Sequence, residues 1–580
     1  MTIRPATLVL LCALAILPHG RETEGGELLH NGIRLPSEWP PDDGPITREP
    51  MRVPYLASPP SVIPIDVGRQ LFVDDFLIEQ TDLSRTFHRA TPYEGNPVLA
   101  PEKPWEIGDG VGATGPFGDG VWFDPKDGLF KMWYLAPPLP EFAERDAARF
   151  PGVPVLYMTC LAVSRDGFRW ERPEFDVVPG TNIVLTELRD STTVWLNHEA
   201  TDPARRFLLM RNHRVPKSVE GDTRAAAFAF SLHESPDGIH WSEAVATTGG
   251  LPWIGDRHTA FYNPFRRVWV LSMRNSIRND PEFVGVRVRL YGENADPGAA
   301  LTGLKRHPWT RSDRLDPRHP KFHDFEPQLY NLDAVAYESV MLGLFSILQG
   351  PENDDAKALE IHKRNEVLLG FSRDGYHWDR PDRTAFLGVN ETDGAWNWGN
   401  VQSVGGGCLV VGDRLYFYYT GRKWSSAAKR GGVSTGVAFL RRDGFASMGA
   451  GEHGGMLTTR PVKFTGRHLF VNADTTGGEL RVEILDEAGG AIGAFSKENC
   501  APVAGDSTKA MVEWSGADDL TSLAGRNIRF RFHLSKGSLF AFWVSPDESG
   551  ASRGFVAASG PGLTGPRDLP SDRAGRKATP

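Results

Sequence analysis

A short motif, Ser-x-Asp-Gly-x-x-Trp, recurs at a long and nearly constant interval, and it limits the fold more than any other feature of the chain. It occurs at residues 164–170, 235–241 and 372–378, with weaker copies at 311–315 and 441–445. The aspartates of the five copies are separated by 71, 76, 61 and 69 residues. A fixed long period is typical of a repeat architecture, so the motif predicts five structural units.

The residues around each copy predict four strands per unit. In the first unit, runs rich in aromatic and β-branched residues cover 120–123, 129–134, 156–163 and 168–172. The Asp-Gly step between the last two runs supplies the positive φ that a tight hairpin turn needs. Four-stranded units repeated around a ring are the blades of a β-propeller. A β-solenoid or a β-sandwich is the alternative, but solenoid coils are much shorter and sandwich strands carry no such repeat.

The repeat stops before residue 456, but strand-like patterns continue to residue 545. A chain of 580 residues exceeds a single ordinary core, so two domains are expected. We therefore predict an all-β fold, with a five-bladed β-propeller over residues 65–455 followed by a C-terminal β-sandwich over residues 456–545.

The two ends of the chain carry different signals. An apolar run over residues 6–17 follows Arg4 and predicts a signal peptide over residues 1–20, hence a secreted or periplasmic protein. A lipoprotein anchor at Cys12 is the alternative. Composition also predicts two segments outside the domains: an extended, proline-rich linker over residues 21–64 and a disordered, glycine- and serine-rich tail over residues 546–580.

Charge and cysteine content limit the partners. The formal charge is −9 and no long basic run offsets it, which argues against nucleic acid and against a membrane surface as partners of the mature protein. Cys160, Cys408 and Cys500 show no metal-ligand spacing. We therefore predict no disulfide framework, no metal site and no cofactor, with a structural divalent cation in the channel as the alternative. A neutral substrate fits this charge better than an anionic one.

The first strand of each blade lines the propeller channel, so the blades can be aligned on that strand. Residues 190–197 align without gaps with residues 256–263, and residues 324–331 fall on the same frame. Three aspartates share the first position of this frame at the predicted channel mouth: Asp190, Asp256 and Asp324.

Further polar residues fall two positions along the same frame, and strand residues two apart face the same side. They are Asp119, His258 and Glu326. A ring of carboxylates is what glycoside cleavage needs, with one protonated carboxyl as acid and one carboxylate as nucleophile or base. Crowding can supply both, because like charges in a partly dry site push pKa values apart. Aspartates before strands also cap loops, so a structural role is the alternative.

Aromatic side chains offer the flat apolar platforms that sugars prefer. Trp105 precedes the first predicted blade, and Trp396 and Trp398 precede the fifth. We assign these three, together with His258 and Arg274, as candidate substrate-binding residues. The alternatives are a metal-ligand or proton-carrier role for His258 and a buried ion pair for Arg274.

The blade layout, the Asp-led inner strands and the Ser-x-Asp-Gly-x-x-Trp turns resemble those of the five-bladed propeller glycosidases. This is the arabinanase, levansucrase and invertase superfamily, which includes glycoside hydrolase families 32 and 43. Five segments are similar to a group of exported bacterial proteins labelled glycosyl hydrolase family 32 N-terminal-like: residues 71–79, 96–99, 103–106, 256–258 and 457–461. The resemblance spans about residues 65–545.

The resemblance implies an exported glycoside hydrolase that cleaves poly- or oligosaccharides with carboxylates on the first three blades. Because blade three offers Asp256 where a glutamate is usual, we assign it as an orienting group or acid. The remaining roles are base or nucleophile for Asp119 or Asp190, and acid for Asp324 or Glu326. A carbohydrate-binding propeller without turnover is the alternative. A sialidase-like activity is less favoured, because it needs an arginine cluster that the sequence alone does not assemble.

Overall fold

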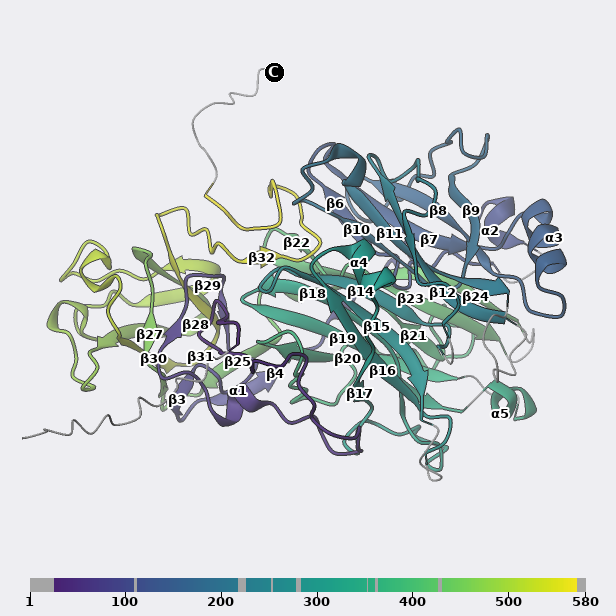
Figure 1. Ribbon diagram of the computed structural model, residues 1–580. Coiled ribbons are helices and arrows are strands. Elements are labelled where there is room, and N and C mark those ends of the chain that lie inside the picture. The colour runs from purple at the N-terminus through teal and green to yellow at the C-terminus, as the bar shows by residue number, and fades with distance from the viewer. Residues whose placement is uncertain are drawn as a thin grey trace, which may run out of the picture.

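The computed structural model describes residues 26–108, 112–216, 226–251, 254–277, 283–351, 353–359, 363–425 and 430–570. The predicted signal peptide lies outside these ranges. Within them, no helix combines the length and the apolar character needed to cross a bilayer. The predicted all-β class is confirmed: the strands form a propeller and a sandwich that lie side by side in Figure 1.

Three blades are separate four-stranded antiparallel sheets in which consecutive strands pair from the channel outward. Blade one comprises β6 (Val121–Asp124), β7 (Leu129–Ala136), β8 (Tyr157–Ser164) and β9 (Ile183–Arg189), with α3 (Pro140–Arg149) between β7 and β8. Blade two comprises β10 (Thr192–Leu196), η1 (Pro203–Arg205), β11 (Phe207–Pro216), β12 (Ala226–Ser235) and β13 (Ala246–Thr247). Blade three comprises β14 (His258–Asn263), β15 (Val268–Ser276), β16 (Arg287–Asn294), α4 (Pro297–Thr302) and β17 (His307–Arg311).

Blades four and five are joined into one sheet by a single parallel pairing of Asn365 with Asn400. Blade four comprises β18 (Gln328–Glu338), β19 (Val340–Gly350), α5 (Asn353–Ala358) and β20 (Arg364–Ser372). Blade five comprises β21 (Asn400–Gln402), β22 (Leu409–Val411), β23 (Arg414–Ser425), β24 (Arg430–Arg441) and, from the other end of the chain, β5 (Thr91–Pro92). The predicted five-bladed propeller is therefore present, and β5 closes its last blade.

The repeated motif ends the third strand of a blade and turns the chain back onto it, but only through a single antiparallel bridge. Ser164 is the last residue of β8, and Gly167 has a φ of 81°, as the turn prediction requires. Within 168–172 only Glu171 pairs with β8, at Val163. The strand predicted at 168–172 is therefore wrong, and β9 is the fourth strand. The weak copy at Asp313 is also misassigned, because it follows the fourth strand of its blade.

The second domain is a nine-stranded sheet folded over as a sandwich. Its C-terminal elements are β25 (Ala446–Ala450), β26 (Gly455–Thr459), β27 (Val462–Lys463), β28 (His468–Leu485), η2 (Gly493–Phe495), β29 (Val503–Met511), η3 (Thr521–Leu523), β30 (Arg529–Ser535) and β31 (Gly537–Ser545). The first half of β28 pairs with β31 and its second half with β30. Phe530, Phe532 and Phe542 pack together in the core beneath these strands.

The predicted domain boundaries need correction at both ends. The N-terminal elements are α1 (Pro54–Ala57), β1 (Ile63–Pro64), β2 (Gln70–Leu71), β3 (Ile78–Thr81), β4 (Ser84–Phe87) and α2 (Pro104–Ile107). Because β2, β3 and β4 pair with β31, β26 and β25, residues 70–87 belong to the sandwich and not to the propeller. Leu29, Tyr55 and Ile63 are buried in the sandwich core, so parts of the predicted linker are packed into it.

The predicted disorder is wrong for residues 546–570. This segment, yellow in Figure 1, crosses from the sandwich to the propeller, where β32 (Phe555–Val556) pairs with β18. Val556 is fully buried. Residues 571–580 lie outside the described ranges.

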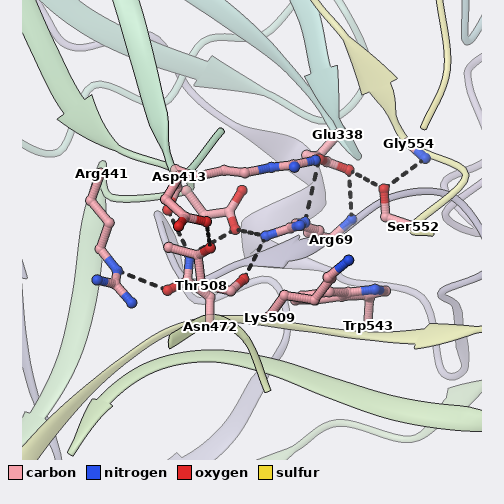
Figure 2. A network of polar contacts seen from close by, with 12 residues as sticks. Arg69, Glu338, Asp413, Arg441, Asn472, Thr508, Lys509, Trp543, Ser552 and Gly554 are labelled. Atoms are coloured by element: carbon pink, nitrogen blue, oxygen red, sulfur yellow. Dashed lines mark hydrogen bonds and ion pairs between the residues drawn. The ribbon is translucent and has the colours of Figure 1, made fainter. Parts of the chain in front are cut away.

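A buried polar network joins the two domains (Figure 2). Arg69, which precedes β2, donates to Asp443 at 2.7 Å and lies 3.6 Å from Glu338. Its guanidinium lies 4.0 Å above the ring of Trp543 in the sandwich. Ser552 of the C-terminal segment donates to Glu338 at 2.6 Å. The side chains of Arg69, Asp443 and Glu338 are at most 1% exposed, so each charge depends on its partners.

The motif aspartates stabilise the turns by accepting backbone hydrogen bonds, and the buried copy should matter most. Asp374 accepts from the backbone N–H groups of Tyr376 and His377 at 2.9 and 2.8 Å and is 5% exposed. The exposed Asp166 accepts two equivalent bonds. Because buried donors without partners cost about 1–3 kcal/mol, we expect Asp374→Ala to lower the free energy of unfolding by that amount, measured by urea denaturation. Asp166→Ala is the matched control and should cost less than about 1 kcal/mol; equal costs would contradict the argument.

Candidate active site

The inner strands all begin at one face of the propeller, and the residues just before them gather at the channel mouth. Asp190 and Asp256 each lie two residues before an inner strand, β10 or β14, and seven residues before the asparagine that ends its frame, Asn197 or Asn263. Their predicted equivalence is therefore confirmed by the strand positions.

Hydrogen bonds between blades two and three hold the two aspartates next to each other. The backbone carbonyl of Asp256 accepts from the hydroxyl of Ser191 at 2.9 Å and from the amide of Asn212 at 2.7 Å. The backbone N–H of Asp190 donates to the carbonyl of Asn212 at 2.9 Å. Arg257 lies 3.6 Å from the Asp190 carboxylate. The side chain of Asp256 is 37% exposed and that of Asp190 is 14% exposed.

The pKa values of the two aspartates are shifted in opposite directions. Burial raises the pKa of Asp190, Arg257 opposes this, and the nearby charge of Asp256 adds to the increase. Burial also acts on Asp256, but Arg274, Arg257 and Arg287 together hold the pKa of that carboxyl well below its usual range. At one pH, therefore, Asp190 can carry a proton while Asp256 is ionised.

The predicted place of Asp324 is wrong. Strand β18 reaches to Glu338, and its hairpin closes where Tyr337 pairs with Val340. The residue seven positions before Tyr337 is Tyr330, whereas Asp324 is an exposed residue of the loop before β18. Sequence alignment missed Tyr330 because β18 is longer than the inner strands of the other blades.

Glu326 lies in the same loop as Asp324, and its carboxylate is surrounded by arginines that hold the fold together. Its carboxylate forms ion pairs with Arg48, Arg311 and Arg318 at 2.9, 3.3 and 2.7 Å. These three charges tie the N-terminal segment to the outer strand of blade three. The prediction that Glu326 faces the channel with Asp119 is therefore wrong.

Asp119 lies beneath the mouth rather than in it. Its side chain is fully buried and forms an ion pair with Arg189, which also donates to the backbone carbonyl of Asp190 at 3.2 Å. Burial raises the pKa of Asp119 to about 7, against the opposing charge of Arg189. A second buried carboxylate, Asp333, adds to this increase, and sequence reasoning missed it because the frame of blade four was shifted. Asp119, Arg189 and Asp333 therefore form a buried polar layer below the channel mouth.

Both ring nitrogens of His258 form hydrogen bonds with backbone groups. Its Nε2 donates to the carbonyl of Gly255 at 2.8 Å, and its Nδ1 accepts from the backbone N–H of Arg274 at 3.1 Å. Both ring nitrogens are therefore used, and burial lowers the pKa of His258 to about 3, so the ring is neutral. Among the described residues, no group of three or more His, Cys, Asp and Glu side chains is arranged to hold a metal ion.

The predicted aromatic platforms fall into two groups. The indole N–H of Trp105 donates to Asn182 at 2.9 Å, beside the outermost strand of blade one, so Trp105 is far from the axis. Trp396 and Trp398 precede β21, the inner strand of blade five. The ring of Trp396 packs over Gly421 of β23, where a Cβ atom would lie 2.2 Å from it. Arg274 contacts Asp256 directly, as an ion pair.

No family model matches the chain, and no curated protein sequence matches it. Solved structures do match. A β-1,2-mannobiose phosphorylase from Listeria innocua is 14% identical, with a TM-score of 0.38 over 61% of this chain and 97% of the other. A family 32 β-fructofuranosidase from Bombyx mori is 10% identical, with a TM-score of 0.34 over 78% and 94% of the two chains. An exo-β-1,3-galactanase from Phanerochaete chrysosporium is 8% identical, with a TM-score of 0.29 over 79% and 99%. Each match is a likeness between this chain and a solved structure at low identity.

Proposed function

We propose that the protein is an exported glycoside hydrolase that cleaves glycosidic bonds of poly- or oligosaccharides at the channel mouth. One observation carries this proposal: Asp190 and Asp256 lie side by side at the starts of neighbouring inner strands, with pKa values shifted in opposite directions. An acid and an ionised carboxylate at one pH are the two groups that glycoside cleavage requires. The apolar run at residues 6–17 supports export.

In this mechanism the protonated Asp190 donates its proton to the leaving glycosidic oxygen. The ionised Asp256 either attacks the anomeric carbon or activates a water molecule. Arg274 and Arg257 keep Asp256 ionised through their positive charge. These roles reverse the assignment made from sequence, because the surrounding charges distinguish two aspartates that the repeat made equivalent.

The test is release of reducing sugar or aryl alcohol from a panel of aryl glycosides and polysaccharides. Binding without any product release would overturn the hydrolase and favour a carbohydrate-binding propeller.

The pH dependence of turnover gives a second, sharper test. The active form has Asp190 protonated and Asp256 ionised, so activity falls below the pKa of Asp256 and above the pKa of Asp190. Arg257 lowers the pKa of both groups. We therefore expect Arg257→Gln to move both limbs of the profile of kcat/KM to higher pH. Limbs that stay in place, or move to lower pH, would contradict the assignment.

A further inference from the structure

Several cationic side chains gather at the channel mouth. Beside Asp190 and Asp256, blades three, four and five bring together five of them: Arg257, Arg274, Arg287, Lys363 and Arg422. Two other arginines near these aspartates have carboxylate partners of their own, since Arg189 pairs with Asp119 and Arg214 lies 4.0 Å from Asp146. Positive charge therefore acts locally on Asp256 and Tyr330, although the whole chain has a formal charge of −9.

Two of these cations lie against the same ring, that of Phe117. The guanidinium of Arg257, from blade three, lies 4.4 Å from the centre of its ring, and that of Arg422, from blade five, lies 5.4 Å away. Phe117 has a φ of 44°, a strained conformation for a bulky residue. Such strain persists where the surroundings enforce it, often at functional sites.

Some nitrogens of this pair make no hydrogen bond within the described part of the chain. Arg257 is 6% exposed; its Nε makes no hydrogen bond there, and its Nη1 lies 3.6 Å from the Asp190 carboxylate. The Nε of Arg422 is also buried without a hydrogen bond. Buried donors without partners are costly. An oxyanion within reach of both guanidinium groups would accept from these donors, because guanidinium groups bind carboxylate and sulfate oxygens in a two-pronged geometry.

Tyr330 extends the same cluster toward blade four. Arg287 and Lys363 lie 5.7 and 5.8 Å from the centre of its ring. Burial alone would raise the pKa of Tyr330, but Arg257, Lys363 and Arg422 lower it below its usual range. A phenol surrounded by cations is a strong hydrogen-bond donor toward an anion.

We propose that the mouth contains a subsite for a negatively charged group of the substrate sugar, a carboxylate or a sulfate ester, held by Arg257 and Arg422 beside Phe117. This inference rests on the proposed function, because the cluster lies beside the two aspartates where the scissile bond would be. It replaces the neutral substrate predicted from overall charge. Local charge decides recognition here, since partly buried groups are screened much less than surface charges.

Calorimetric titration tests the subsite without requiring turnover. The probes are glucuronate, glucose 6-sulfate, glucose and inorganic sulfate. We expect the wild-type protein to bind at least one charged sugar at least tenfold more tightly than glucose, and more tightly than inorganic sulfate. Arg422→Gln should weaken that binding at least tenfold. Arg414→Gln removes the same charge from the far, exposed end of the same strand and should change nothing.

The outcomes separate the two proposals. Equal binding of glucose and both charged sugars would overturn the subsite, even if neutral glycosides are hydrolysed. Equal binding of inorganic sulfate and the charged sugars would also overturn it, because the anion would then not belong to the sugar. Charged sugars bound through Arg422 without product release from charged glycosides would support the subsite and overturn the hydrolase. If Arg422→Gln fails to fold, the wild-type titrations alone decide.

Discussion

Replacing Asp190 or Asp256 by asparagine is expected to reduce turnover of a cleaved glycoside by roughly 10²–10⁴-fold, the usual contribution of a positioned acid or base. Asparagine keeps the shape of the side chain but can neither donate the proton that Asp190 supplies nor provide the charge of Asp256. Initial rates at saturating substrate measure the effect, and thermal unfolding of each variant checks that the fold is retained.

Asp324→Asn is the matched control for these two variants. Sequence alignment made Asp324 equivalent to Asp190 and Asp256, whereas the structure places it in an exposed loop before β18. Its replacement should leave turnover close to that of the wild type. Comparable losses in all three variants would support the sequence frame against the structural one, and full activity of Asp190→Asn and Asp256→Asn would refute the catalytic assignment.

Replacing Arg69 by methionine is expected to destabilise the protein by about 3–5 kcal/mol, because it leaves buried carboxylates without their partner. Asp443 loses an ion pair at 2.7 Å and Glu338 loses the guanidinium at 3.6 Å, in the network of Figure 2 that joins the two domains. The midpoint of urea denaturation, followed by tryptophan fluorescence, measures the change.

Arg467→Met supplies the control for the loss of an arginine. Arg467 is 58% exposed and pairs with Asp519 at 2.6 Å on the sandwich surface. Exposed ion pairs contribute about 0–1 kcal/mol, so this variant should unfold near the wild-type midpoint. If both variants shifted the midpoint equally, burial of the Arg69 network would not be what stabilises the junction.

Local sequence patterns predicted the propeller because each blade repeats the same strand and turn signals. Asp190 and Asp256 were paired correctly, since their blades keep the same seven-residue spacing to the hairpin. The alignment of inner strands was wrong in blade four, because β18 extends to Glu338. Tyr330 and Asp333 were therefore missed.

The role of His258 could not be read from its position in the sequence. Its two nitrogens are used by Gly255 and by the backbone of Arg274, which is sixteen residues away in the neighbouring strand.

The predicted domain boundaries were wrong for a similar reason. Strand pairing between residues 70–87 and the C-terminal domain is a long-range contact, and local propensity carries no information about it.

The number of blades and the repeated position of Asp190 and Asp256 follow from local sequence, because strand alternation and turn geometry depend on neighbouring residues. The opposite pKa shifts of these two aspartates depend on the tertiary structure. So does the approach of Arg257 and Arg422, which lie 165 positions apart in the sequence, to the same ring of Phe117. Burial and Coulomb interactions depend on distance in space, and the closed ring of blades brings together charges that the chain keeps apart.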